Sequence, residues 1–503
     1  MKNAVVVNAL NISEYAFEEF SGGESAFSLL LKKAEKLPDV EALFVFTTKD
    51  LDSGDLNSGV SFTQVKETFT GMAQLLETLL QHTGKGRFDN VFYLFGDTPL
   101  IDPSLTERMY SNHKKYFASY TFAEGFPYGL APEILKTDIF PPLIRLAEKG
   151  SSPVSRDGIF EVIKKDINFF DIETELSEKD QRMLRVSLSA DTKRNFNQMK
   201  RIFDAGGKDE SSITGILETR GDLLRVEPAF VNVQISGGCP QACSYCPYPG
   251  INKDLLTSRD YMSLKDWKTI LAKVHEYSDD AVFSVSLWGE PSLHPDITAF
   301  VEALLFYEKF SLIIETSGIG WKKETLDALK ELDDGRLSWI LSLDAENSES
   351  YRTLRGEGWE EALMAAEYLS RGFGERFYIQ SVRMKSNEEY LEKFFRKWKD
   401  KGINTIIQKY DNFCSVLPDR KVTDISPLLR NPCWHIKRDL TILIDGTVQM
   451  CREDLKNEFS LGNILKEKLD VIWERGTPLY QKHLERDYPE ICRKCDEYYT
   501  YNF

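Results

Sequence analysis

Short apolar runs alternate with longer amphipathic segments over the first two hundred residues of the chain. We expect strands at residues 4–8, 42–47 and 90–95, and helices at residues 26–36 and 62–80. This alternation predicts an α/β domain with a mainly parallel sheet. Residues 204–214, rich in Gly, Ser and charge, are expected to form a linker after it.

The same alternation returns in the middle of the chain and predicts six strand–helix repeats, the pattern of a partial α/β barrel. The predicted strands are residues 230–235, 281–287, 311–315, 338–343, 378–383 and 405–408. The predicted helices between them include residues 263–277, 295–307 and 387–401. Ligands of α/β barrels gather at the C-terminal ends of the strands, so those ends are the expected place of a site.

The last part of the chain is smaller, and its pattern predicts a hairpin. Residues 440–444 and 447–450 are apolar and flank Asp445-Gly446, a pair that favours tight turns. A chain of 503 residues is too long for one ordinary domain. We therefore expect an α/β protein of three domains, residues 1–207, 215–425 and 426–503.

Composition and charge narrow the classes of partner. The formal net charge is -16, the wrong sign for binding duplex nucleic acid or an anionic membrane through a basic face. No stretch of about 18 apolar residues is present, which predicts no membrane span. The N-terminal residues lack the pattern of a signal peptide, so a cytoplasmic location is expected.

All eight cysteines lie at residue 239 or beyond. A disulfide scaffold would spread them over a small secreted domain. Cys239, Cys243 and Cys246 follow the first predicted barrel strand on a loop containing Gly and Pro. Three thiolates at this spacing suit three corners of a four-iron cluster and leave one iron open for a small molecule. A zinc loop or a cluster of core thiols is the alternative.

A second set of cysteines lies in the C-terminal part of the chain. Cys433 and Cys451 flank the predicted hairpin, and Cys492 and Cys495 form a chelating pair. Four thiolates can close a tetrahedral zinc site or ligate a four-iron cluster completely, and the spacing does not separate the two.

The Cys239–Cys243–Cys246 triad, with Tyr245 before its third Cys, resembles that of radical S-adenosylmethionine (SAM) enzymes over residues 229–424. The resemblance implies a catalytic [4Fe–4S] cluster that binds SAM and reduces it to a 5′-deoxyadenosyl radical, which abstracts hydrogen from a substrate. An electron donor such as flavodoxin or ferredoxin is implied as well.

Further motifs of this family follow at the ends of the predicted strands. Gly289-Glu290-Pro291 matches a segment that lines the SAM amino group, although Trp288 replaces the first Gly of the family motif. The resemblance also implies SAM-binding roles for Thr316, Ser342, Asp344 and Arg355, the last as a partner for the carboxylate. For each residue alone, a helix cap or a solvated loop is the alternative.

The C-terminal block resembles the SPASM or twitch extension of radical SAM enzymes. The matching segments are Cys433-Trp434, residues 442–448, Cys451, Leu461-Gly462-Asn463, Val471-Ile472-Trp473 and Cys492–Cys495. The extension implies an auxiliary [4Fe–4S] cluster on Cys433, Cys451, Cys492 and Cys495, the second cluster of the chain. Cys414 precedes this block and is expected to be an unligated thiol.

The N-terminal block carries Gly96-Asp97-Thr98-Pro99-Leu100-Ile101, which resembles acylneuraminate cytidylyltransferases, of the nucleotide-diphospho-sugar-transferase fold. The resemblance implies that Asp97 helps to bind Mg²⁺, which prefers oxygen ligands. Residues 128–135 and 189–192 echo later segments of that family. The Gly-rich loop with an Arg after the first strand is missing, so a degenerate domain that binds a nucleotide-sugar or a partner is favoured over an active transferase.

These resemblances lead to a radical SAM enzyme acting on a sugar or nucleotide-sugar, in surface glycan synthesis. The chain also resembles a spirochaete group of radical SAM–SPASM proteins with such an N-terminal region. Two alternatives stay open: a maturase that modifies a peptide or protein, and a scaffold that binds a nucleotide-sugar and uses its clusters structurally.

Overall fold

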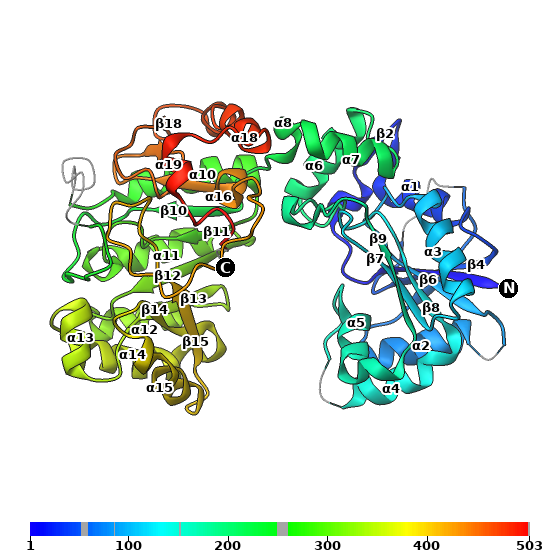
Figure 1. Cartoon of the computed structure of the whole chain (residues 1–503), viewed down its shortest axis with the longest axis horizontal. Coiled ribbons are helices and arrows are strands. Elements are labelled where there is room, and N and C mark those ends of the chain that lie inside the picture. The colour runs from blue at the N-terminus through cyan, green and yellow to red at the C-terminus, as the bar shows by residue number, and fades with distance from the viewer. Residues whose placement is uncertain (52–58, 85, 150–151, 249–259, 501–503) are drawn as a thin grey trace. The chain divides into compact units, whose positions relative to one another are not determined.

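The chain forms two compact units, Met1–Leu224 and Arg225–Phe503 (Figure 1). The computed structural model describes residues 1–51, 59–84, 86–149, 152–248 and 260–500. Within these ranges no helix has the length and apolar character needed to cross a membrane.

The first unit is built on a seven-stranded sheet in the order β5-β4-β1-β6-β8-β7-β9. Its strands are β1 (Asn3–Ala9), β4 (Val40–Thr47), β5 (Thr63–Lys66), β6 (Asn90–Phe95), β7 (Tyr120–Glu124), β8 (Glu133–Lys136) and β9 (Ile172–Leu176). The strand β8 runs antiparallel to both its neighbours, whereas the other pairs are parallel. The mainly parallel sheet expected from the sequence is thus present.

Helices surround this sheet because their apolar faces need burial. Its α-helices of six or more residues are α1 (Ala26–Ala34), α2 (Met72–Thr83), α3 (Pro103–Lys115), α4 (Phe140–Glu148), α5 (Gly158–Ile163), α6 (Lys193–Asp204) and α7 (Glu210–Thr219). The core strand β1 is buried along its whole length, as its sequence of apolar residues between two Asn requires.

Two expectations for this unit were wrong. Residues 62–80 are not one helix, because the strand β5 takes the first part and α2 begins only after Gly71. Residues 204–214 are not a linker between domains, because they lie within the first unit. They contain the end of α6 and the start of α7. The Asp209 side chain accepts from the Ser212 amide, and the Ser212 hydroxyl accepts from the Asp209 amide, which together cap α7.

The second unit contains a nine-stranded sheet in the order β15-β14-β13-β12-β11-β10-β16-β17-β18. Six parallel strands form the partial barrel: β10 (Phe230–Val233), β11 (Ala281–Ser284), β12 (Phe310–Thr316), β13 (Leu337–Ser342), β14 (Phe377–Arg383) and β15 (Asn404–Lys409). Each of the six strands predicted from the sequence is present.

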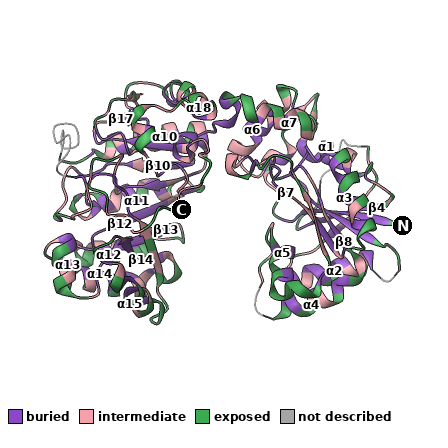
Figure 2. Cartoon of the chain, in the orientation of Figure 1, coloured by how far each residue is buried: buried purple, intermediate pink, exposed green. Residues whose placement is uncertain are grey.

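Helices connect the barrel strands and bury large side chains against them. They are α10 (Leu264–Ser278), α11 (Ile297–Leu305), α12 (Lys323–Leu332), α13 (Ser348–Arg355), α14 (Trp359–Phe373) and α15 (Glu388–Lys399). Trp267, Trp339 and Trp398 are fully buried in the hydrophobic core between these helices and the sheet. Figure 2 shows how burial concentrates along the strands.

The C-terminal segment extends the barrel sheet. The strand β16 (Asp439–Ile442) pairs in parallel with β10, and the antiparallel strands β17 (Thr447–Gln449) and β18 (Ser460–Asn463) follow. The predicted hairpin is formed by β16 and β17. Four short helices complete the segment: α16 (Trp434–Arg438), α17 (Leu469–Glu474), α18 (Thr477–Leu484) and α19 (Glu490–Lys494).

Candidate active site

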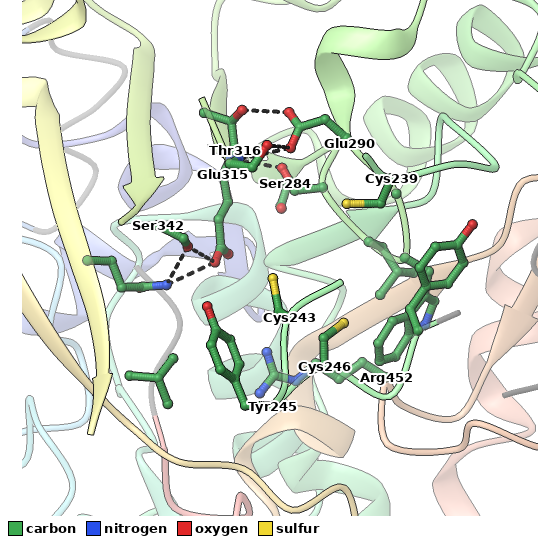
Figure 3. A pocket seen from close by; sticks show the side chains of 18 of the residues that line it. Cys239, Cys243, Tyr245, Cys246, Ser284, Glu290, Glu315, Thr316, Ser342 and Arg452 are labelled. Atoms are coloured by element: carbon green, nitrogen blue, oxygen red, sulfur yellow. Dashed lines mark hydrogen bonds between the residues drawn. The ribbon is translucent and has the colours of Figure 1, made fainter. Parts of the chain in front are cut away.

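A cavity of about 230 Å³ lies at the C-terminal ends of the barrel strands. Cys239, Cys243 and Cys246 line it together with Glu290 and Arg452 (Figure 3). The cavity is therefore where ligands of α/β barrels are expected, and it brings the three thiols together with side chains from distant parts of the sequence.

The cysteine loop follows β10 and is anchored at several points. The Ser244 amide donates to the Leu354 carbonyl at 2.8 Å, and the Tyr248 hydroxyl donates to the Gly237 carbonyl at 2.6 Å. In Figure 3 the sulfur atoms of Cys239, Cys243 and Cys246 face one common space. The backbone thus holds three thiols ready to bind one group.

The chemistry of these thiols fits an iron–sulfur cluster. Burial raises the pKa of Cys239 to about 11 and the pKa of Cys246 to about 12, and burial also raises the pKa of Cys243. Buried thiolates need a cation that compensates for their lost hydration. Iron bound to all three sulfurs provides that compensation.

Gly289 is required by the close approach of two backbone segments. A Cβ atom on Gly289 would collide with the carbonyl oxygen of Ser236. The preceding residue, Trp288, adopts φ +47°, a conformation that Gly adopts without strain. The Trp288 ring packs at 5.6 Å from the Phe413 ring, a contact that the Gly of the family motif cannot make.

Glu290 organises the wall of the cavity beside Cys239, and its amide donates to the Gly238 carbonyl at 2.8 Å. Its carboxylate accepts hydrogen bonds from the Thr316 hydroxyl at 2.5 Å and from the Ser317 amide and hydroxyl at 2.8 and 2.7 Å. Burial raises the pKa of Glu290, and these hydrogen bonds oppose the rise. Thr316, at the end of β12, and Glu290 therefore form one hydrogen-bonded unit whose oxygens can accept hydrogen bonds from a ligand. Pro291 begins the short 3-10 helix Pro291–Leu293 that follows it.

Arg355 and Asp344 form a buried ion pair of 2.6 Å. The Asp344 carboxylate also accepts from the Tyr245 hydroxyl at 2.5 Å and from the Val382 amide at 2.6 Å. Arg355 was expected to meet the carboxylate of SAM, whereas here its guanidinium binds Asp344. Its Nε remains buried without a hydrogen-bond partner among the described residues, and Arg355 lines the cavity.

Polar side chains from all six barrel strands meet in the same cavity, and sequence reasoning missed three of them, Asn232, Ser284 and Gln408. Each strand contributes at least one polar residue, and β12 contributes two: Asn232, Ser284, Glu315, Thr316, Ser342, Gln380 and Gln408. The Gln380 amide donates to Glu315 Oε1 at 3.0 Å and to the Ser342 hydroxyl at 3.2 Å. The available signal was a polar residue close to the end of each apolar strand.

A second group of thiols surrounds a small enclosed cavity in the C-terminal segment. It includes Cys433, Cys451, Cys492 and Cys495, together with Cys414. Burial raises the pKa of Cys433, Cys451 and Cys492, to about 12 for Cys492. Such a closed, thiol-rich cavity fits a fully ligated cluster. Cys414 lies inside this group, whereas the sequence placed it outside.

The N-terminal motifs also meet in space. The Ala190 amide donates to the Asp97 carbonyl at 2.8 Å, so residues 189–192 pack against the end of β6. Arg156 binds Asp97 with both terminal nitrogens, one of them at 3.1 Å, and lies 4.0 Å from Asp191. This guanidinium neutralises the Asp97 carboxylate, the expected ligand of a divalent ion. The site as built does not fit Mg²⁺.

The two cysteine groups lie in segments of the chain that match known protein families. Residues 233–405 match the model of the Radical SAM superfamily, and residues 433–496 match SPASM, an iron-sulfur cluster-binding domain. The chain is a radical SAM enzyme with a SPASM domain, and its cofactors are two [4Fe–4S] clusters and SAM. It belongs to the same family as a protein of Treponema pallidum (strain Nichols) named only as uncharacterized. The two are 35% identical over 360 residues, 69% of this chain and 98% of that protein.

Solved structures resemble parts of the chain weakly. BtrN in complex with AdoMet and 2-DOIA is 18% identical, covers 54% of this chain and 93% of its own, and has a TM-score of 0.37. Streptococcus suis SuiB bound to the precursor peptide SuiA is 14% identical. The match covers 67% of this chain and 78% of SuiB, with a TM-score of 0.42. A cytidylyltransferase from Leptospira borgpetersenii serovar Hardjo-bovis is 16% identical, covers 44% and 97%, and scores 0.38. At these scores none carries information about the substrate.

Proposed function

We propose that this enzyme abstracts hydrogen from a hydroxyl-rich substrate, a sugar or nucleotide-sugar, in the barrel cavity. The observation that carries the proposal is the shared cavity of the three thiols, the Glu290 network and the ring of polar side chains. SAM bound to a reduced cluster supplies a 5′-deoxyadenosyl radical as the hydrogen acceptor. The protein must position the substrate and exclude water.

The proposed ligands follow from the positions of the side chains. Cys239, Cys243 and Cys246 would hold the catalytic cluster, and Gly289, Glu290 and Thr316 would bind the ammonium end of SAM. The carboxylate of Glu290, already fixed by Thr316 and Ser317, offers the negative charge that an ammonium group needs. Pro291 fixes the turn behind it.

Two further groups would complete the SAM site. Ser342 ends β13 in the cavity wall, where its hydroxyl can meet the ribose. Asp344 holds Arg355 and Tyr245 in place, and the free Nε–H of Arg355 remains as the donor toward the SAM carboxylate.

The substrate class follows from the cavity lining. The strand residues supply amides, hydroxyls and one carboxylate, groups that pair with hydroxyls of a sugar. Leu287, Trp288, Val382 and Phe413 add apolar surface to the lining, and polar groups left unpaired would penalise a purely apolar substrate. Arg452 also lines the cavity, where its guanidinium is paired with Glu453 at 3.0 Å and with Asp411 at 3.4 Å.

The auxiliary cluster would lie next to this substrate space, because Arg452 lines both cavities. We infer that the auxiliary cluster either accepts an electron from the substrate radical or helps to position the substrate.

Anaerobic reconstitution with dithionite and SAM tests the proposal. We expect about eight irons per chain and 5′-deoxyadenosine, with deuterium transfer from a deuterated member of a nucleotide-sugar pool. No 5′-deoxyadenosine despite full iron loading would refute radical chemistry. Deuterium transfer from a peptide, and none from any sugar, would refute the substrate class and favour a maturase.

For the N-terminal unit we propose a degenerate nucleotidyltransferase domain that binds a nucleotide-sugar or a partner without a metal ion. The support is Arg156, which is bound to Asp97 and the Tyr128 hydroxyl and stacks over the Phe95 ring at 5.0 Å. Calorimetric titration with CTP and Mg²⁺ should give no heat that depends on Mg²⁺. Formation of pyrophosphate from CTP would overturn the proposal.

A further inference from the structure

Five thiols, one more than a four-iron cluster needs, line the C-terminal cavity. Four of them belong to the C-terminal segment, and the fifth, Cys414, comes from the chain that leaves the last barrel strand, β15. The arrangement therefore provides a surplus ligand.

A turn in the left-handed conformation brings Cys414 to the cavity. Phe413, Cys414 and Ser415 have φ values of +50°, +54° and +72° in succession. Left-handed backbone is costly for residues with a Cβ atom, so the surroundings must hold this turn in place. Asn412 does so in part, because its side chain accepts from the Ser415 amide at 3.1 Å and its carbonyl from the Leu417 amide at 3.0 Å.

The turn aims its two inner side chains at different sites. The Phe413 ring packs on Trp288 in the catalytic cavity. The thiols of Cys414 and Cys495 line the C-terminal cavity together and lie within interaction distance of each other. Cys414 therefore neighbours one particular ligand of the expected set, Cys495.

We propose that Cys414 and Cys495 share one corner of the auxiliary cluster, either thiol being able to bind the iron at that corner. This inference rests on the proposed auxiliary cluster. The thiol that is not bound donates its S–H to the sulfur that is bound. Hydrogen bonds to cluster sulfurs help to set the reduction potential, so the spare thiol tunes the cluster as well as replacing a ligand.

The test counts iron in full-length protein from which the catalytic cluster has been removed. In the background Cys239→Ala/Cys243→Ala/Cys246→Ala, the auxiliary cluster alone should give about four irons per chain. On this background, Cys495→Ala should keep more than half of the iron, because Cys414 takes over the corner. The matched control Cys492→Ala, which has no fifth thiol beside it, should lose at least three quarters. The double variant Cys414→Gly/Cys495→Ala should fall as low as Cys492→Ala.

Changing Cys414 alone gives an independent readout. Cys414→Gly keeps the turn, since glycine adopts this backbone freely. It should leave the iron count unchanged while shifting the midpoint potential and the electron paramagnetic resonance spectrum of the reduced cluster. Cys414→Ser should shift the potential less, because the hydroxyl still donates a hydrogen bond.

Two results would overturn the shared corner: equal iron loss in Cys495→Ala and Cys492→Ala, or an unchanged potential and spectrum in Cys414→Gly. A background protein without iron, or one that binds zinc instead, would refute the auxiliary cluster itself. The two failures are therefore distinguishable.

Discussion

At the scale of single residues, Gly289 shows how tightly the SAM site is built. A side chain there would force apart the segments that carry Ser236 and Glu290. We expect Gly289→Ala to weaken SAM binding at least tenfold, about 1.4 kcal/mol, without loss of iron. Equilibrium binding of SAM to the reconstituted enzyme measures it. Gly238→Ala is the matched control, because its Cβ would meet only Leu293 at an ordinary 3.5 Å. Equal affinity in both variants would contradict the steric argument.

The buried pair of Arg355 and Asp344 gives a second prediction at this scale. Arg355→Met removes the cation and leaves Asp344 charged in the interior, which costs roughly 3–5 kcal/mol of unfolding free energy. Arg383→Met is the control, because Arg383 pairs with Glu388 on the surface and such pairs contribute at most about 1 kcal/mol. Denaturant unfolding under anaerobic conditions compares them, and a similar loss in both would argue against the buried pair.

At the scale of secondary-structure elements, His113 ties α3 to two strands. Its ring nitrogens lie 2.8 Å from the Thr121 hydroxyl on β7 and 3.1 Å from the Asn90 side-chain oxygen on β6. Burial, and then the charge of Lys136, lowers the pKa of His113 to about 4. The neutral ring is therefore favoured in the folded state. Its contribution to stability is complete above the ordinary pKa of about 6.5 and is lost as the pH falls toward 4.

The His113→Gln variant checks this contribution. Near pH 7.5 its first unit should melt below that of the wild type, and the difference should shrink as the pH is lowered from 6.5 to 4.5. Scanning calorimetry of the full chain measures both. A difference in melting temperature that stays constant over this range would show that the pKa of His113 is the same in the folded and unfolded states.

At the scale of the whole molecule, β16 joins the cysteine-rich segment to the barrel. Because β16 pairs with β10, the barrel and the SPASM segment share one sheet. We expect residues 225–503 to unfold in one transition and residues 1–224 in another. Calorimetry should show two transitions, and Arg156→Ala should move only that of the first unit. A separate transition for the SPASM segment would contradict the shared sheet.

The sequence predicted the six barrel strands and the cysteine groups well, because apolar runs and thiol spacing are local signals. It misassigned residues 62–80, where the short strand β5 lies at the sheet edge and has only one buried residue, Val65. It predicted Cys414 to be an unligated thiol before the auxiliary site, because no local pattern predicts a left-handed turn of three residues that are not glycine.

The sequence by itself determined that Cys239, Cys243 and Cys246 would meet, because three thiols on one short loop are close in any fold. It also determined the α/β architecture, through the periodicity of its apolar residues. Only the tertiary structure decided which distant groups meet. It paired Asp97 with Arg156 and Arg355 with Asp344, brought together polar residues from all six barrel strands, and placed Cys414 beside Cys495. Strand register and turn geometry bring these groups together, and the local spacing of residues predicts neither.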